Sequence, residues 1–169
     1  MNDTLPTVVP PNPIPGNPVM HLVHLIYVSR FTPVCDTVAL RNILAVSRAY
    51  NNQHDITGLL CYDPEFFMQW LEGPRAEVNR LYHNIINDPR HRDAQIITYA
   101  DISDRAFRHW SMAYISARNI DAQLIAQYCP HARFEPYSMG AVIAREFMLA
   151  AARAHARDKD FDKVLSKAR

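Results

Sequence analysis

The sequence predicts an α+β fold, in which a ferredoxin-like βαββαββ sheet carries two helices on one face and is followed by C-terminal helices. Runs of apolar and β-branched residues, each of strand length, recur five times between residues 20 and 115. Two amphipathic segments with helical periodicity separate these runs, one after the first and one after the third. The chain has 169 residues, of which 49% are hydrophobic, so one domain with a sizeable core and additions is expected.

The strands are predicted from apolar, β-branched and aromatic runs that are bounded by turn residues. They are expected over residues 20–29, 56–62, 66–71, 94–100 and 110–115. The second and third strands form a hairpin, because Asp63-Pro64-Glu65 between them has the composition of a turn. Gly73-Pro74 is predicted to break the third strand, since proline has no backbone donor for a sheet.

The helices are predicted from apolar residues at helical spacing. They are expected over residues 37–53, 74–87, 120–128 and 137–157. Asp36 can cap the first helix, and Pro74 suits the first turn of the second. The last helix has a broad apolar face that includes Val142 and Phe147. We expect it to pack on the open face of the sheet or on another subunit.

Three regions are expected along the chain. Residues 1–19 hold six of the twelve prolines and are predicted to form a disordered tail. Residues 20–117 contain the predicted sheet and its two helices, and residues 118–169 form a C-terminal helical extension.

Composition excludes several classes of protein. A net charge of +1 gives no electrostatic reason to expect binding to nucleic acid or to an anionic membrane. The three cysteines form no CxxC pair, which argues against a disulfide framework and for a reducing cytoplasm. The sequence shows neither a signal peptide nor an apolar run of membrane-spanning length, so a cytoplasmic protein is expected.

Motifs for metal or phosphate chemistry are also missing from the sequence. The four glycines cannot form GxGxxG or a P-loop, so a nucleotide-like ligand would be held by side chains and helix ends. There is no HExxH and no clustered Cys/His set, and no metal site is expected.

Gln69 lies in the middle of an aromatic-rich strand, where it shares a face with Phe67 and Leu71. A buried amide needs polar partners, because leaving it unpaired costs roughly 1–3 kcal/mol. The residues alone leave three explanations open: this face is the outer one, a backbone group satisfies the amide, or the amide has a function.

Five motifs then point to a known family. They are LIYVSR at 25–30, YNNQHDITGLL at 50–60, FMQWLEGP at 67–74, DPRHRD at 88–93 and WSMAY at 110–114. In this order and spacing, over about Leu22–Tyr114, the chain resembles the BLUF family of blue-light sensors that use flavin. FEPYSMGAV at 134–142 is similar to the C-terminal helical extension of its short members.

The resemblance implies a flavin cofactor: FAD, with FMN and riboflavin as alternatives. The family's light-responsive residues fall on Tyr27, Ser29, Gln69, Trp110 and Met112. Its cofactor-binding residues fall on Tyr27, Ile43, Asn51, Asn52, Gln69, Ile85, Asp88, Arg90 and His91. Ile43 and Ile85 would clamp the ring, and Asn51 or the neighbouring Asn52 would bond its edge. The last three residues of the set would lie near the ribityl chain and phosphate.

The resemblance also implies a mechanism. Tyr27 can give an electron and a proton to the excited flavin, and Gln69 bridges the two because an amide both donates and accepts. After their return, rotation or tautomerisation of the amide would leave a new hydrogen bond on the flavin and a red-shifted absorption. Such a switch consumes no substrate, so no enzyme activity is expected.

The expected output runs through the last predicted strand, in which Trp110 and Met112 are two residues apart and share a face. From there the C-terminal helices would signal to an unidentified partner protein, and a homo-oligomer is expected. Two alternatives stay open: an acylphosphatase-like phosphate hydrolase that uses an Arg and an Asn, and an interaction module with a decayed flavin site.

Overall fold

We describe residues 21–33 and 37–167 in a computed structural model of the chain. The strands are β1 (Leu22–Phe31), β2 (Thr57–Tyr62), β3 (Phe66–Pro74), β4 (His91–Asp101) and β5 (Ala113–Ser116). The α-helices are α1 (Thr37–Gln53), α2 (Arg75–Ile86), α3 (Ala122–Tyr128) and α4 (Ala141–Lys167). The predicted tail over residues 1–19 and the Asp36 cap lie outside the described residues.

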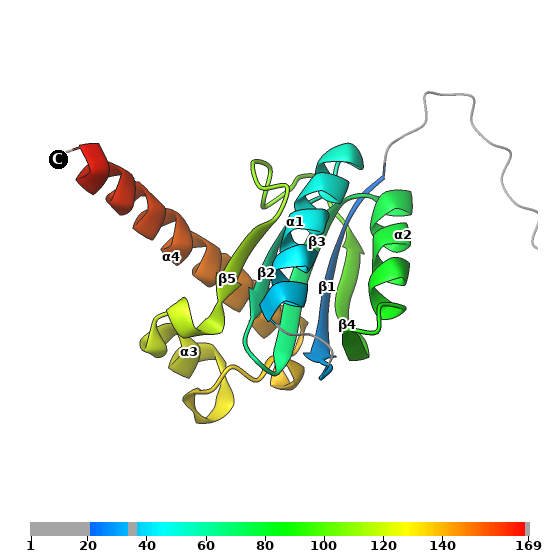
Figure 1. The fold of residues 1–169 in the computed structure, drawn as a ribbon. Coiled ribbons are helices and arrows are strands. Elements are labelled where there is room, and N and C mark those ends of the chain that lie inside the picture. Colours follow the sequence, from blue (N-terminus) through cyan, green and yellow to red (C-terminus); the bar gives the residue numbers. More distant parts are fainter. Residues whose placement is uncertain (1–20, 34–36, 168–169) are drawn as a thin grey trace, which may run out of the picture.

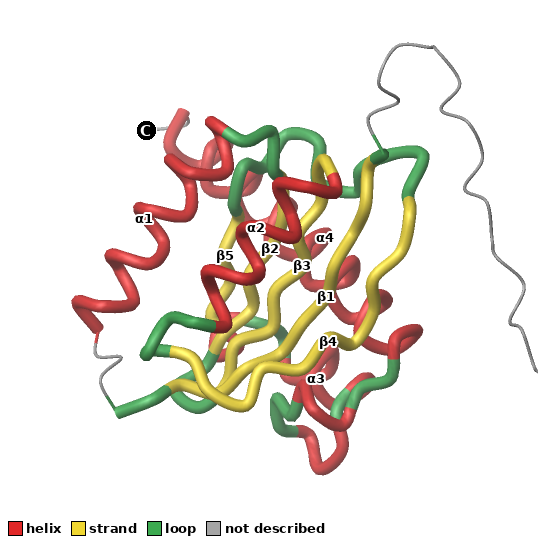
Figure 2. The backbone as a smooth tube through the Cα atoms, turned by 90° about the vertical axis from the view of Figure 1, so that its right-hand side faces the viewer, coloured by secondary structure: helices red, strands yellow, loops and turns green. Residues whose placement is uncertain are grey.

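The strands form one mixed sheet in the order β4-β1-β3-β2-β5. β1 pairs antiparallel with β3 and with β4, β2 pairs antiparallel with β3, and β5 lies parallel to β2. Helices α1 and α2 lie side by side on one face (Figure 1), and the strands twist along the sheet (Figure 2). The predicted α+β, ferredoxin-like fold is confirmed.

Both faces of the sheet are covered, which explains why nearly every residue of β3 is buried. Side chains alternate along the strand: Phe67 and Leu71 join the core under α1 and α2, whereas Met68 and Trp70 join a second core on the other face.

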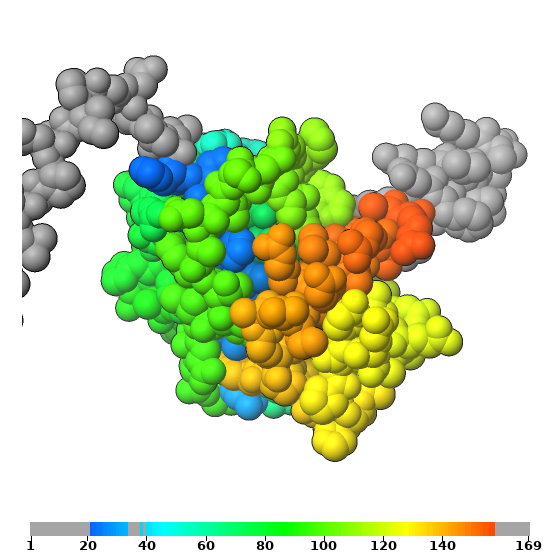
Figure 3. All heavy atoms as spheres, turned by 180° about the vertical axis from the view of Figure 1, so that it is seen from behind, coloured from blue at the N-terminus to red at the C-terminus, as the bar shows by residue number. Residues whose placement is uncertain are grey.

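Helix α4 covers that second face. Its buried residues Ala144, Phe147, Met148 and Ala151 recur at helical spacing and pack in the same core as Trp70. Seen from behind, α4 lies across the sheet beside the segment that contains α3 (Figure 3). Of the two positions expected for the last helix, the structure shows the open sheet face.

The predicted break at Gly73-Pro74 is wrong. β3 continues to Pro74, because Gly73 pairs with Val23 and Pro74 with Leu22. The structure uses proline at the end of the strand, and α2 begins at Arg75. Glycine is needed at position 73 because a Cβ would lie 2.9 Å from the carbonyl oxygen of Asp55.

The last strand is shorter than predicted. β5 begins at Ala113, and the three residues before it are irregular, since Trp110 N donates to Phe107 O over 3.0 Å and closes a turn. The expectation that Trp110 and Met112 share a face is therefore wrong. Met112 is buried in the core under α1 and α2, whereas Trp110 packs against the core under α4.

The described residues include no helix that combines the length and the apolar character needed to span a membrane.

Candidate functional site

A buried phenol–amide pair lies at the centre of the sheet. Tyr27 in β1 and Gln69 in β3 are register partners, and both side chains face α1 and α2. Tyr27 Oη donates to Gln69 Oε1 over 2.5 Å, and Gln69 Nε2 donates to Met112 Sδ over 3.4 Å. The amide therefore has distinct partners for its oxygen and its nitrogen, so its orientation is defined.

The surroundings of Tyr27 keep its phenol protonated. Burial raises the pKa of Tyr27 strongly, and the nearby Tyr82 and Asp88 raise it further. The Tyr82 ring packs edge-on to it, with ring centroids 5.3 Å apart. The phenolic proton stays available to the amide oxygen of Gln69.

Asn51, near the C-terminal end of α1, is fully buried, whereas its neighbour Asn52 is exposed. Asn51 Nδ2 donates to Ser111 O over 2.7 Å. Its Oδ1 is buried without a hydrogen-bond partner among the described residues. Because an unpaired buried acceptor is costly, Asn51 Oδ1 fits a ligand that offers an N–H group, as the edge of a flavin ring does.

A cleft of about 180 Å³ opens between α1 and α2. It is lined by Ile43, Val46, Ser47, Tyr50, Leu81, Asn84, Ile85, Asp88, Arg90 and His91. Ile43 comes from α1 and Ile85 from α2, so the cleft has apolar side chains from both helices. Such a lining suits a flat aromatic ring with two apolar faces.

One end of the cleft is polar. The Asp88 carboxylate accepts from Arg90 N over 2.9 Å, from Nε over 2.8 Å and from Nη2 over 2.5 Å, and these bonds lower the pKa of Asp88. Arg90 is a fixed cationic group suited to a phosphate.

His91 lies beside that ion pair and reaches toward β1. Its Nδ1 lies 2.8 Å from Ser29 Oγ, and its ring stacks on Phe67 with centroids 4.4 Å apart. Burial lowers the pKa of His91 to about 4, so the ring is neutral at pH 7. Ser29, one of the predicted light-responsive residues, thus contacts His91.

The structure brings most of the predicted site residues to one face of the sheet. Gln69, which accepts from Tyr27, also contacts Met112, and the cleft collects five of the predicted residues from both helices, the turn after α2 and the start of β4. Asn52 and Trp110 do not join them: Asn52 is exposed, and Trp110 packs in the core of the opposite face.

Sequence reasoning missed two residues that fix the segment before β5. Arg48 Nε donates to Met112 O over 3.2 Å, one helical turn before Asn51. Glu72 is buried in β3, and its two carboxylate oxygens accept from the backbone N–H groups of Ala106 and Phe107, each over 3.0 Å. A glutamate near the end of a largely apolar strand was the available signal for Glu72.

No group of three or more His, Cys, Asp and Glu side chains that could hold a metal ion occurs within the described part of the chain.

The fold is that of a ferredoxin-like α+β domain with a cleft between two helices. The family profile described as "BLUF: Sensors of blue-light using FAD" matches residues 22–113, which is more than half of the chain. The chain belongs to the BLUF family, a family of blue-light sensors that bind FAD.

Proteins of similar sequence have names that refer to light. The chain is 36% identical over 92 residues to "Photoactivated adenylate cyclase subunit beta" of Euglena longa, which covers 54% of this chain and 11% of that protein. It is 34% identical over 70 residues to "Blue light- and temperature-regulated antirepressor BluF" of Escherichia coli K12, which covers 41% of this chain and 17% of that protein. The chain thus spans less than a fifth of the length of either relative.

Solved structures match over more of the chain. "BlsA photo-activated state" has a TM-score of 0.70 and 26% identity, over 77% of this chain and 94% of that one. "BlrB - a BLUF protein, dark state structure" has a TM-score of 0.66 and 29% identity, over 80% of this chain and 97% of that one.

Proposed function

We propose that Tyr27 and Gln69 form the light-responsive pair of this BLUF sensor, and that the rearranged pair signals through Met112 and α4 to a partner protein. The observation that carries the proposal is the buried hydrogen bond of 2.5 Å from Tyr27 Oη to Gln69 Oε1, with Met112 Sδ at the other end of the amide.

Several residues fit the cofactor. Ile43 and Ile85 would lie against its two faces, and Asn51 Oδ1 is an unpaired acceptor for an N–H of the ring edge. Arg90 and His91 would lie at the phosphate-bearing end. Arg90 would have to share its guanidinium between Asp88 and a phosphate.

The chemistry of the pair follows from its hydrogen bonds. A bound flavin would supply the blue-light-driven acceptor for one electron. Tyr27 would give up that electron while its phenolic proton moves toward Gln69 Oε1, the acceptor already in place. Both return to Tyr27, and the amide of Gln69 is left rotated or tautomerised. Rotation exchanges the positions of Oε1 and Nε2, which alters the hydrogen bonds to Tyr27 and to Met112.

A route from the pair to α4 is supported by contacts of the segment before β5. Three consecutive carbonyls accept hydrogen bonds: Trp110 O from Gly58 N, Ser111 O from Asn51 Nδ2 and Met112 O from Arg48 Nε. The Trp110 ring in turn packs edge-on to His155 of α4, with centroids 6.4 Å apart. A change at Met112 can therefore reach α4 through one short segment.

The boundaries of the sensor belong to the same proposal. We place the BLUF domain at residues 20–117 and the helical extension at 118–169, which is supported by the family match and by the end of β5 at Ser116. The acylphosphatase-like alternative is not favoured, because the family match over residues 22–113 is to blue-light sensors that use FAD.

The test is the absorption spectrum of the flavin-loaded protein before and after blue light. We expect a red shift that reverses in the dark. Tyr27→Phe and Gln69→Leu should each abolish the shift while the flavin stays bound, because each removes one end of the hydrogen bond. Tyr128→Phe, in α3, is the matched control and should keep the shift. A normal shift in both pair variants, or a protein that takes up no flavin, would contradict the proposal.

A further inference from the structure

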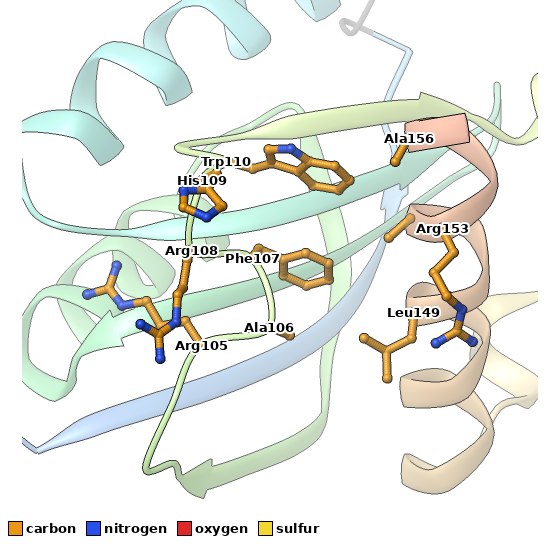
Figure 4. A pocket seen from close by; sticks show the side chains of 10 residues that line it. Arg105, Ala106, Phe107, Arg108, His109, Trp110, Leu149, Arg153 and Ala156 are labelled. Carbon is orange, nitrogen blue, oxygen red and sulfur yellow. The ribbon is translucent and has the colours of Figure 1, made fainter. Parts of the chain in front are cut away.

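A groove of about 430 Å³ lies on the side of the sheet opposite the flavin cleft. One wall is the loop that precedes β5, and the other is α4. The groove is lined by Arg105, Ala106, Phe107, Arg108, His109, Trp110, Leu149, Ala152, Arg153 and Ala156. Figure 4 shows the rings of Phe107 and Trp110 pointing toward α4, where Leu149 and Ala156 face them.

The α4 wall has the form of a helix-binding surface. Leu149, Ala152 and Ala156 recur at spacings of three and four residues, so they share one face of the helix. Leu149 and Ala156 are half-buried, whereas Ala152 is buried, and the small side chain of Ala156 lets another backbone approach closely. Opposite them, the half-buried Trp110 ring stacks on the buried Phe107 ring with centroids 5.8 Å apart, so Trp110 supplies the aromatic surface of this wall. An apolar groove of this kind suits the apolar face of an amphipathic helix.

The charge of the lining defines the occupant further. Every polar side chain in the lining is basic: Arg105, Arg108, His109 and Arg153. Arg105 pairs with Asp55 and Arg108 with Asp104, whereas Arg153 forms no ion pair with the residues that the structure describes. Arg153 is exposed on α4 at the edge of the apolar floor. A carboxylate beside the apolar anchors of a partner would complement it.

The loop wall is tied to the light-responsive site in two ways. Glu72 of β3, the strand that carries Gln69, accepts from the backbone of Ala106 and Phe107. At the other end of the loop, Trp110 lies two residues from Met112, which contacts the amide of Gln69. A rearrangement of that amide therefore acts on the wall of the groove.

We propose that this groove docks the protein that receives the light signal, and that the docked segment is an amphipathic helix with aliphatic side chains flanked by carboxylates. The link to light rests on the proposed function, whereas the docking site itself rests on the lining of the groove.

The test uses the full, flavin-loaded chain and two labelled helical peptides with the same leucine and alanine face. One carries glutamate on its polar face and the other carries lysine. Fluorescence anisotropy in the dark should show saturable binding of the glutamate peptide and about tenfold weaker binding of the lysine peptide. No saturable binding of the glutamate peptide, or equal binding of both, would overturn the proposal.

Two pairs of variants locate the site. Arg153→Glu should weaken binding of the glutamate peptide about tenfold. Arg118→Glu, which reverses an exposed charge outside the lining, should leave that binding unchanged. Ala156→Phe should fill the groove and weaken binding, while Ala154→Phe, on α4 outside the lining, should not. Binding that is unchanged in both Arg153→Glu and Ala156→Phe would overturn the proposal.

A measurement under blue light distinguishes the docking proposal from the proposal about Tyr27 and Gln69. In one sample the flavin absorption and the peptide affinity are measured together, and we expect the affinity to change several-fold when the absorption shifts. A normal shift with unchanged affinity would refute the groove as the output site. Peptide binding with no shift in absorption would support the docking site and refute the light-responsive pair.

Discussion

The side chains of Gln69 and Asn51 show how single polar groups are oriented inside an apolar core. Gln69 is satisfied within the protein, because its oxygen accepts from Tyr27 and its nitrogen donates to Met112. Asn51 is satisfied only at its nitrogen, and its buried Oδ1 has no partner among the described residues. Because such an atom carries a cost of roughly 1–3 kcal/mol, a ligand that donates a hydrogen bond to Asn51 Oδ1 would remove that cost.

Asn51→Ala should therefore weaken FAD binding about tenfold, since it removes the proposed hydrogen bond to the ring and the contact to Ser111. Asn52→Ala is the matched control, because Asn52 is exposed and adjacent in sequence. Titration of the flavin-free protein with FAD, followed by flavin fluorescence, measures both affinities. Equal affinities, or a larger loss in Asn52→Ala, would show that Asn51 is not the ring-edge residue.

Among the elements, β3 contributes polar side chains to both faces of the sheet. Gln69 faces α1 and α2, and three residues later Glu72 faces the opposite side, where it holds the loop over residues 105–107. Burial raises the pKa of Glu72, while the N–H groups of Ala106 and Phe107 favour its charged form. A carboxylate can accept both bonds, whereas an amide would turn its NH₂ group toward one of the two donors.

Glu72→Gln should for this reason lower the free energy of unfolding by about 1–3 kcal/mol. The measurement is the urea midpoint of the flavin-loaded protein at neutral pH. Glu146→Gln, on an exposed position of α4, should change stability by less than about 0.5 kcal/mol. If Glu72→Gln were as stable as the parent protein, the carboxylate would not be what anchors the loop.

At the scale of the whole molecule, the two faces of one sheet have separate cores. Tyr27, of the proposed light-responsive pair, lies in the core under α1 and α2, and the core under α4 contains Trp70, Phe107 and Phe147. The same strands contribute alternate side chains to both cores. A change in the core on one face can therefore shift residues of the core on the other face, through the strands and the loop before β5.

Phe147→Ala tests how much α4 contributes to the fold. The side chain is fully buried, so its loss should lower the free energy of unfolding by about 3–5 kcal/mol. Val142→Ala, on the same helix at 74% exposure, should have little effect. Thermal unfolding followed by circular dichroism compares the two. Similar midpoints for Phe147→Ala and the parent protein would mean that α4 is not packed as described.

Local patterns in the sequence determined most of the fold. Period-two and period-3.6 repeats located the five strands and the helices α1 and α2. They failed where the conformation depends on contacts between residues that are distant in the sequence. Gly73-Pro74 suggested a break, but its pairing with β1 continues the strand. Trp110 and Met112 suggested one shared face, but a turn at Phe107 places them on opposite sides of the sheet.

The sequence by itself also determined the family and the cofactor, because five ordered motifs on one chain are specific even when each alone is weak. Only the tertiary structure decided that Asn51 rather than Asn52 is buried, that Met112 rather than Trp110 meets Gln69, and that Glu72 anchors a distant loop. These facts depend on which side chains converge across separate strands and helices, and no spacing along the chain encodes that convergence.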